Sequence, residues 1–142
     1  MKPGVDYIAV GVVYYCTDGN GKVVMNLRGA KCKDENGRWD IGGGTVEFGE
    51  TLEETLVREI KEEYCAEIQE KEFLGFREVL IDEQDRKRHW IAFDFKVRLD
   101  PSQVKNGEPH KFDDVAWFTK DALPSPLHSQ MPIFFEKYAA KL

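Results

Sequence analysis

The stretch from Gly44 to Ala66 constrains this chain most, because a glycine-rich turn runs there directly into a segment dense in carboxylates. Between Glu47 and Glu63 there are seven glutamates and only two basic residues. The whole chain of 142 residues has a formal net charge of −6 at pH 7. Nearly all of its excess acidity therefore lies in this stretch, and the fold must place it where so much charge is tolerated.

A capping box predicts where a helix begins within this stretch. The hydroxyl of Thr51 can accept a hydrogen bond from an N-terminal amide, while Glu54 reaches back to the amide of Thr51. The helix should therefore begin at about Leu52. At about 100° per residue, one arc of this helix is apolar and we expect it to be buried. The side chains on this arc are Leu52, Leu56, Val57, Ile60 and Tyr64.

Three glutamates share the adjoining arc of this helix. Glu59, Glu62 and Glu63 are spaced i, i+3 and i+4, and like charges this close repel one another. A hard divalent cation is the simplest agent that would offset the repulsion, with waters and substrate phosphates as further ligands. A carbonyl of the turn at residues 42–44 can also approach an ion closely, because glycine has no Cβ. The arrangement predicts a magnesium site to which this helix supplies the carboxylate ligands.

At these residues the sequence resembles the Nudix hydrolase family. The family's motif is glycine, five residues, glutamate, seven residues, arginine and glutamate, an aliphatic residue, any residue, two glutamates, any residue, glycine and a final aliphatic residue. The positions that match in type and spacing are Gly44, Glu50, Arg58, Glu59, Ile60, Glu62 and Glu63. Ala66 is an acceptable last residue, whereas Cys65 stands in place of the second motif glycine. Because a helix exit with positive φ is easiest for glycine, Cys65 predicts a strained turn or a changed exit.

The resemblance implies a metal site built from these residues. Glu62 and Glu63 would bind Mg²⁺ directly, with Mn²⁺ as a substitute. Glu59 would bind the metal or take the proton from the attacking water. The carbonyl of Gly44 would complete the site.

The resemblance also implies positioning and substrate-binding residues. Arg58 would pair with Glu50 and hold the loop against the helix. Arg28 occupies a place similar to a phosphate- or base-contacting arginine in MutT-like members, and Trp39 is favoured for stacking on a nucleobase because it precedes the glycine turn. Other basic residues in the same polar loop that are candidates for phosphate contact are Lys31, Lys33 and Arg38.

Two further segments offer an extra carboxylate, as some family members have. The candidates are Asp82, Glu83, Asp85, Glu108, Asp113 and Asp114. Acids in solvated surface turns are commoner, so an ordinary turn remains the alternative interpretation for each of them.

The rest of the chain lacks the regular strand–helix alternation of a doubly wound sheet. The expected strands are Val5–Cys16, Lys22–Arg28, one or two bent at Gly75 within Glu67–Ile81, His89–Leu99 and Val115–Phe118, with a polar loop at Asp82–Arg88. The first of these is almost continuously apolar, as expected for a strand buried on both faces. A terminal helix is expected at Met131–Leu142, with Ile133, Phe134 and Tyr138 facing inward. The pattern predicts an α+β fold, and the resemblance implies the Nudix αβα sandwich, a mixed central sheet between helices.

Composition bounds the organisation of the chain. At 42% hydrophobic residues and without a shift in composition, residues 1–142 are expected to form a single domain. No apolar run approaches the ~20 residues that span a bilayer, and no secretory signal is evident, so we expect a cytoplasmic protein with no membrane partner. The cysteines Cys16, Cys32 and Cys65 are odd in number and irregularly spaced, which predicts free thiols. A pI of about 5.1 without a basic patch argues against a nucleic acid partner, and a homodimer is left open.

The leading functional hypothesis is Mg²⁺-dependent hydrolysis of a phosphoanhydride bond in a nucleoside diphosphate linked to another group, foremost a nucleoside triphosphate or a related small nucleotide. The alternatives are an ADP-ribose or nucleotide-sugar pyrophosphatase and a regulatory Nudix-like module that binds a nucleotide without cleaving it. RNA decapping is disfavoured by the acidic balance. The residues that discriminate substrates lie in loops such as 29–38, 82–88 and 101–112, where no motif is decisive.

Overall fold

The structure is a computed structural model that describes all of residues 1–142. It is a seven-stranded mixed sheet with strand order β3-β2-β1-β6-β5, in which β4 also pairs with β1 and β7 with β2. The elements are β1 Ala9–Thr17, β2 Lys22–Arg28, β3 Trp39–Asp40, β4 Gly43–Thr45, α1 Leu52–Tyr64, β5 Ile68–Glu83, β6 Arg86–Leu99, β7 Phe112–Thr119, α2 Met131–Tyr138 and a 3-10 turn Ala139–Lys141. Neither helix is both long enough and apolar enough to cross a membrane.

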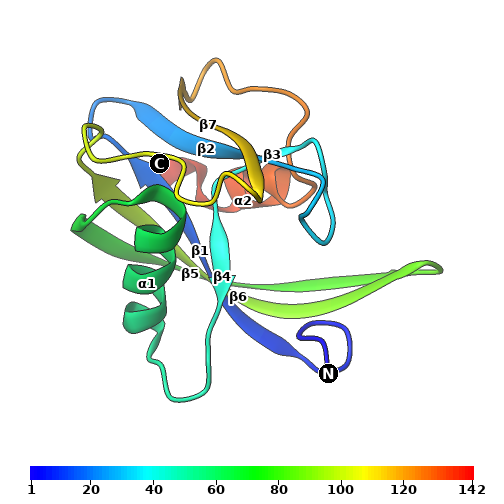
Figure 1. Cartoon of the computed structure of the whole chain (residues 1–142). Helices are drawn as coiled ribbons and strands as arrows, with labels where there is room; N and C mark the ends of the chain where they lie inside the picture. The colour runs from blue at the N-terminus through cyan, green and yellow to red at the C-terminus, as the bar shows by residue number, and fades with distance from the viewer.

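Strand β1 organises the sheet because it has partners on both sides, β6 along its whole length on one side and short stretches of β4 and β2 on the other. It runs parallel to β6 and antiparallel to β2 and β4. Successive side chains of a strand point to opposite faces, so Tyr14 joins the core under α1 and Tyr15 joins the core under α2. The helices therefore lie on opposite faces of the sheet (Figure 1). The expected α+β class with a mixed sheet between helices is confirmed.

The predicted first strand is correct from Ala9 onward. The sequence indicated 5–16, but pairing begins at Ala9, and Ile8 is 55% exposed. The preceding residues instead form a turn closed by the Gly4 N–H, which donates to the Tyr7 carbonyl at 2.9 Å. The apolar run therefore extended beyond the buried strand.

The hairpin of β5 and β6 is longer than the sequence predicted. Residues 68–83 form one continuous strand whose register shifts between Phe73 and Gly75, which confirms the bend at the glycine. The polar stretch 82–88 is mostly strand rather than loop, because backbone pairing continues to Glu83 and Arg86. The connecting turn is thus only two residues long, and the hairpin tip projects away from α1 (Figure 1).

Helix α1 begins as its capping box predicts. The Glu54 N–H donates to Thr51 Oγ1 at 3.1 Å, and the Thr51 N–H donates to Glu54 Oε1 at 3.2 Å. Leu56 and Ile60 are fully buried, as expected, but Val57 is 49% exposed, and its predicted burial is wrong. The buried arc is narrower than predicted because α1 packs mainly on β1 and β4.

The terminal helix is confirmed but shorter than expected. Helix α2 ends at Tyr138 and continues as a 3-10 turn. Phe134 and Tyr138 are buried, whereas the predicted inward orientation of Ile133 is wrong, since this side chain is 50% exposed. The three cysteines are free thiols, as expected.

Candidate active site

Arg58 connects three parts of the acidic region. Its Nε and Nη2 donate to the two carboxylate oxygens of Glu50 at 2.8 and 2.9 Å, a forked ion pair. Its Nη1 donates to Glu59 Oε1 at 2.8 Å, and Nη2 also donates to the Thr45 carbonyl at 3.2 Å. The hydrogen bonds from Arg58 lower the pKa of Glu50 to about 2. The arginine thus ties the loop after β4 and the strand itself to the middle of α1.

The close approach of the backbone at position 44 to α1 explains why this residue is a glycine. A Cβ at position 44 would lie 2.1 Å from Glu59 Cδ, an impossible contact, so any other residue would push the carboxylate away. The side chain of Glu59 is 12% exposed. Its pKa is raised by burial, against the opposing effect of Arg58. Gly44 and Glu59 are therefore held against each other.

Glu63 is the most buried acid of the region, at 1% exposure. The Tyr14 hydroxyl donates to Glu63 Oε1, and Lys111 Nζ lies 3.6 Å from Oε2. Burial raises the pKa of Glu63 to about 8, with a further increase from Glu108 and an opposing effect of Lys111. A buried carboxylate whose one ion-pair partner lies 3.6 Å away would be stabilised by an additional cation.

Glu62 is the accessible member of the predicted metal set. Its side chain is 50% exposed, and its nearest cation is Arg58 Nη1 at 3.5 Å. Nowhere in the chain do three His, Cys, Asp or Glu side chains converge closely enough to hold a metal ion, because Glu59 and Glu63 are each engaged by protein partners. The donor set nevertheless fits a hard divalent cation in kind, since it consists of carboxylates beside a glycine that leaves room for close approach. The metal site remains a prediction.

Of the additional carboxylates, the fold brings one to the site. Glu108 lies close enough to Glu63 to raise its pKa. Asp113 lies beside Gly29, and Asp114 accepts from the neighbouring Val115 N–H. The remaining candidates are at the tip of the β5–β6 hairpin, remote from α1 (Figure 1).

The two predicted substrate contacts are occupied by protein partners. Arg28 Nη2 lies 3.3 Å from Asp34 Oδ1 and Nη1 lies 3.7 Å from Asp40 Oδ2. Trp39 packs edge-on against Phe118, with ring centroids 5.0 Å apart, at the border of the α2-side core. Their roles toward a nucleotide remain predictions.

Sequence reasoning missed Tyr14 and Lys111. Both lie far from α1 in the sequence: Tyr14 is in β1, and Lys111 directly precedes β7. Their contacts with Glu63 depend on how the sheet brings these segments under the helix. No local pattern around either residue signals such a contact.

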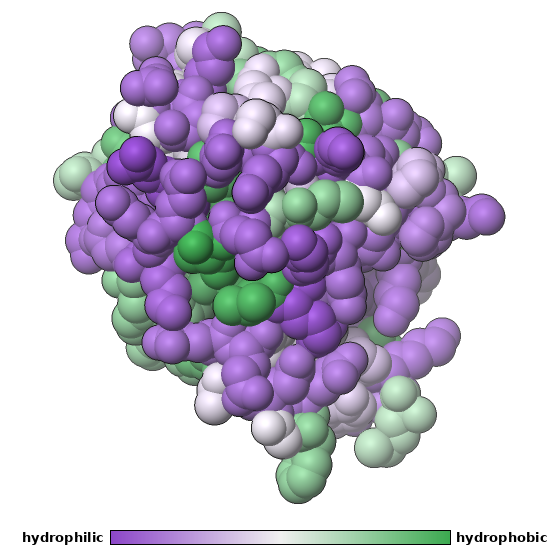
Figure 2. Space-filling model, turned by 60° about the vertical axis from the view of Figure 1, so that its left-hand side comes forward, coloured by the Kyte–Doolittle hydropathy of each residue, from purple (hydrophilic) through white to green (hydrophobic).

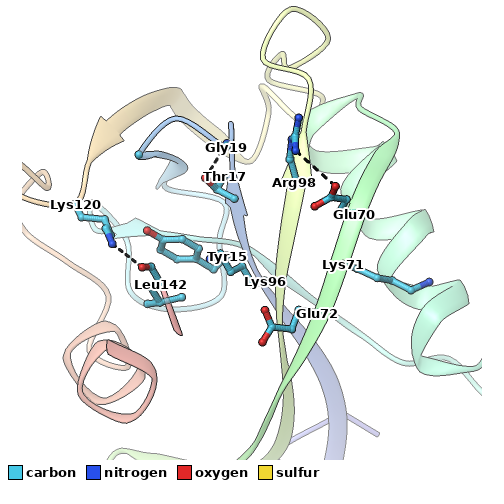
Figure 3. Close-up of a pocket in the computed structure, with 11 residues that line it drawn as sticks. Tyr15, Thr17, Gly19, Glu70, Lys71, Glu72, Lys96, Arg98, Lys120 and Leu142 are labelled. Carbon is cyan, nitrogen blue, oxygen red and sulfur yellow. Dashed lines mark hydrogen bonds and ion pairs between the residues drawn. The ribbon is translucent and has the colours of Figure 1, made fainter. Parts of the chain in front are cut away.

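The surface around the site is hydrophilic. Figure 2, in which the side of α1 is turned forward, shows a mostly hydrophilic face broken by a small hydrophobic area. A cavity of about 500 Å³ lies elsewhere, lined by the ends of β1, β5 and β6 and by residues near the C-terminus. In Figure 3, Lys120 donates to the Leu142 carbonyl and Arg98 pairs with its cross-strand neighbour Glu70, while Lys71 points away toward α1. It contains none of the motif residues, so it is separate from the acidic site.

Comparison with known proteins agrees with this geometry. The chain is 28% identical over 143 residues to the 8-oxo-dGDP phosphatase NUDT18 of Homo sapiens, covering 99% of this chain and 41% of that protein. It is 28% identical over 120 residues to the CTP pyrophosphohydrolase of Escherichia coli (strain K12), covering 83% of this chain and 82% of that protein. The crystal structure of the MutT NUDIX hydrolase from Burkholderia pseudomallei superposes with a TM-score of 0.81 at 26% identity, covering 93% of this chain and 98% of that chain.

These relatives differ in length. The chain spans less than half of the animal relatives that it matches, between 30% and 41% of their length. The family model described as the NUDIX domain matches residues 7–138, which include every element from β1 to α2. The chain therefore belongs to the Nudix hydrolase family.

Proposed function

We propose that this chain hydrolyses a phosphoanhydride bond in a small nucleotide with the help of a divalent cation, foremost Mg²⁺. The observation that carries the proposal is that Arg58 joins Glu50 to Glu59, that Glu59 lies against Gly44, and that the buried Glu63 on the same helix has its one ion-pair partner 3.6 Å away. Members of this family typically use a divalent metal. The site has carboxylates that could hold a divalent cation and a further carboxylate, Glu59, that could move a proton.

Hydrolysis of a phosphoanhydride is mainly an electrostatic problem, because negative oxygens repel an incoming hydroxide and the departing phosphate carries charge. A bound divalent cation would neutralise that charge and orient the phosphates. Glu62 and Glu63 would hold it, together with the carbonyl of Gly44. Both side chains present oxygen ligands, which suit Mg²⁺.

Glu59 is the best placed group for moving a proton. Its raised pKa brings the carboxylate closer to neutral pH, where a general base is most effective. Arg58 has a positioning role, since it contacts both Glu59 and the loop carboxylate Glu50. Loss of Arg58 would free Glu59 to turn away from Gly44.

The substrate class follows from the relatives and from the sequence hypothesis together. The human relative is named for a nucleoside diphosphate, 8-oxo-dGDP, and the E. coli relative for a nucleoside triphosphate, CTP. A free nucleoside triphosphate or diphosphate is therefore our first choice, ahead of ADP-ribose and nucleotide sugars. Arg28 and Trp39 would contact it only after giving up part of their present contacts.

The test is a panel of nucleotides with Mg²⁺, assayed for phosphate, pyrophosphate and mononucleotide products. The panel contains nucleoside tri- and diphosphates, their 8-oxo forms, ADP-ribose and nucleotide sugars. Glu62→Gln should reduce turnover by about 10²-fold or more, because it removes a charged ligand from an exposed position without disturbing the core. Glu136→Gln, an exposed acid on α2, is the matched control. Binding of a nucleotide without any product would favour the regulatory module, and equal turnover of Glu62→Gln and wild type would remove Glu62 from the mechanism.

A further inference from the structure

Lys111 is the cation nearest to the buried Glu63. Its Nζ lies 3.6 Å from Glu63 Oε2, and no other basic side chain is within 4 Å of that carboxylate. The side chain of Glu63 is 2% exposed, whereas that of Lys111 is 35% exposed. One partner is fixed in the core, and the other reaches it from the surface.

The backbone of Lys111 is held on both sides, while its side chain has few contacts. The Lys111 carbonyl accepts from the Gly29 N–H at 2.9 Å and from Cys32 Sγ at 3.4 Å, and its own N–H donates to the Glu108 carbonyl at 2.9 Å. Beyond Glu63, the ammonium contacts only the Phe112 ring, 5.1 Å from its centroid. A flexible four-carbon stem on an anchored backbone lets the charge move without moving the loop.

We propose that Lys111 is a tethered cation that neutralises Glu63 when no divalent ion is bound and competes with that ion for the carboxylate. This inference rests on the metal site of the proposed function, but it concerns the strength of metal binding rather than hydrolysis. Lys111 is thus a residue that sets metal affinity.

The physical reason is that a buried carboxylate without a cation destabilises the chain. Lys111 lowers the free energy of the metal-free protein by pairing with Glu63. When a divalent ion binds Glu63, the ammonium must retreat toward solvent, because two cations at one carboxylate repel each other. Metal binding therefore breaks the Lys111–Glu63 pair. The loss of this pair makes metal binding weaker than it would be without Lys111.

The experiment compares the wild-type chain, residues 1–142, with Lys111→Met, Lys111→Arg and Lys105→Met. Lys105 belongs to the same connection before β7, its side chain is exposed, and it makes no side-chain hydrogen bond or ion pair, so Lys105→Met controls for the loss of one positive charge. Mg²⁺ binding is measured by calorimetry and Mn²⁺ binding by electron paramagnetic resonance, both without nucleotide. Lys111→Met should bind both ions roughly three- to tenfold more tightly, the range expected for a partly exposed ion pair. Lys111→Arg and Lys105→Met should bind them like the wild type.

A second readout follows from linkage between binding and stability. In EDTA at pH 9, Lys111→Met should melt below the wild type, because the carboxylate of Glu63 loses its partner. Saturating Mg²⁺ should raise the melting temperature of Lys111→Met by more than that of the wild type. Lys111→Arg should behave like the wild type in both conditions.

Three outcomes would overturn the inference. Metal affinity of Lys111→Met equal to or weaker than wild type would do so, as expected if Lys111 instead serves a substrate phosphate. An equal increase of metal affinity in Lys105→Met would mean that the increase in Lys111→Met comes from the change in net charge. Absence of metal binding in every variant would mean that Lys111 has no ion to compete with. None of these readouts requires hydrolysis: tighter binding in Lys111→Met without turnover on any nucleotide would refute the proposed function alone, whereas turnover with unchanged metal affinity would refute this inference alone.

Discussion

Two buried carboxylates lie on opposite faces of the sheet and are treated very differently. Asp94, under α2, is fully buried and accepts from Arg77 Nε at 2.7 Å, from Arg77 Nη2 at 2.9 Å and from the Tyr138 hydroxyl at 2.6 Å. Glu63, under α1, accepts from the Tyr14 hydroxyl, and its one ion-pair partner is an ammonium at 3.6 Å. We call the Arg77–Asp94 pair closed, because both carboxylate oxygens of Asp94 accept hydrogen bonds from the forked guanidinium. We call the Lys111–Glu63 pair open, because the ammonium lies 3.6 Å from the carboxylate.

The difference indicates what each carboxylate is for. A forked pair with a further hydroxyl satisfies the acceptor capacity of Asp94, so it has no need of a ligand. The side of Glu63 that faces Lys111 can accept a stronger cation, because its present partner is at the long limit of an ion pair. We interpret the α2 face as structural and the α1 face as the one prepared for a ligand.

The largest expected effect that separates the two faces is on activity. Glu63→Gln should reduce kcat/KM for the nucleotide substrate by about 10²–10⁴-fold, because it removes a negative charge from the cation site while keeping the shape of the side chain. Circular dichroism should show an unchanged fold. Steady-state kinetics over a range of Mg²⁺ concentrations provide the measurement.

If Glu63→Gln retains wild-type kcat/KM at all Mg²⁺ concentrations, Glu63 has no role in the reaction, and the proposed functional difference between the α1 and α2 faces is wrong. A loss that saturating Mg²⁺ fully restores would limit Glu63 to metal affinity. Arg77→Lys, which disturbs only the α2 face, is the control and should change kcat/KM little per folded molecule.

The next largest effect is on stability. Asp94→Ala should lower the free energy of unfolding by about 3–5 kcal/mol, because it leaves Arg77 buried without its partner. The double variant Arg77→Met, Asp94→Leu should recover most of that loss, since a buried pair can be replaced by packed apolar side chains. Urea unfolding measures both. A small loss in the single variant would mean that Arg77 reaches solvent and that the α2 face is not closed.

The same comparison explains how much the sequence predicted. The capping box, the start of α1 and the contact between Arg58 and Glu50 are local in sequence, and the structure has all three. The pairing of Tyr14 with Glu63 spans 49 positions and depends on the order of strands in the sheet. No periodicity within α1 indicates which strand lies beneath it.

On the α2 face the sequence was less informative still. Asp94 stands on the polar side of an alternating strand, a pattern that ordinarily indicates solvent. It is buried because α2, more than thirty residues further along, covers that side of β6 and contributes the hydroxyl of Tyr138. The exposed position of Val57 has a similar origin, because the neighbours of α1 decide how wide its buried arc is.

The pH dependence of stability offers a third and smaller test of the open pair. Burial raises the pKa of Glu63 from 4.5 to about 8, so between these values the folded chain holds a proton that the unfolded chain has released. Stability should therefore fall as pH rises through this window, by at most about 4 kcal/mol between pH 5 and pH 8.5. Urea unfolding in EDTA at pH 5 and pH 8.5 should show this fall in wild type and a smaller one in Glu63→Gln. Identical slopes would mean that Glu63 is solvated or fully paired, like the acid on the other face.

The smallest effect concerns the backbone next to each carboxylate. Beneath Tyr138 the strand uses Gly75 at φ +152°, where a Cβ would lie 3.1 Å from the tyrosine oxygen. At the exit of α1 the left-handed position is held by Cys65, with φ 59° and ψ 23°, so the exit keeps its expected shape with a residue that is strained there.

Cys65→Gly should therefore raise the free energy of unfolding by up to about 1 kcal/mol, because glycine adopts positive φ without a Cβ clash. Cys65→Ala is the matched control, since it removes the thiol but keeps the strain, and should bring no gain. Urea unfolding of the three proteins at one pH measures the difference. If alanine stabilises as much as glycine, the thiol and not the backbone is the unfavourable element, and the exit of α1 is not strained. If neither does, contacts of the Cys65 side chain, whose Sγ lies near Gly107, offset the strain of its backbone.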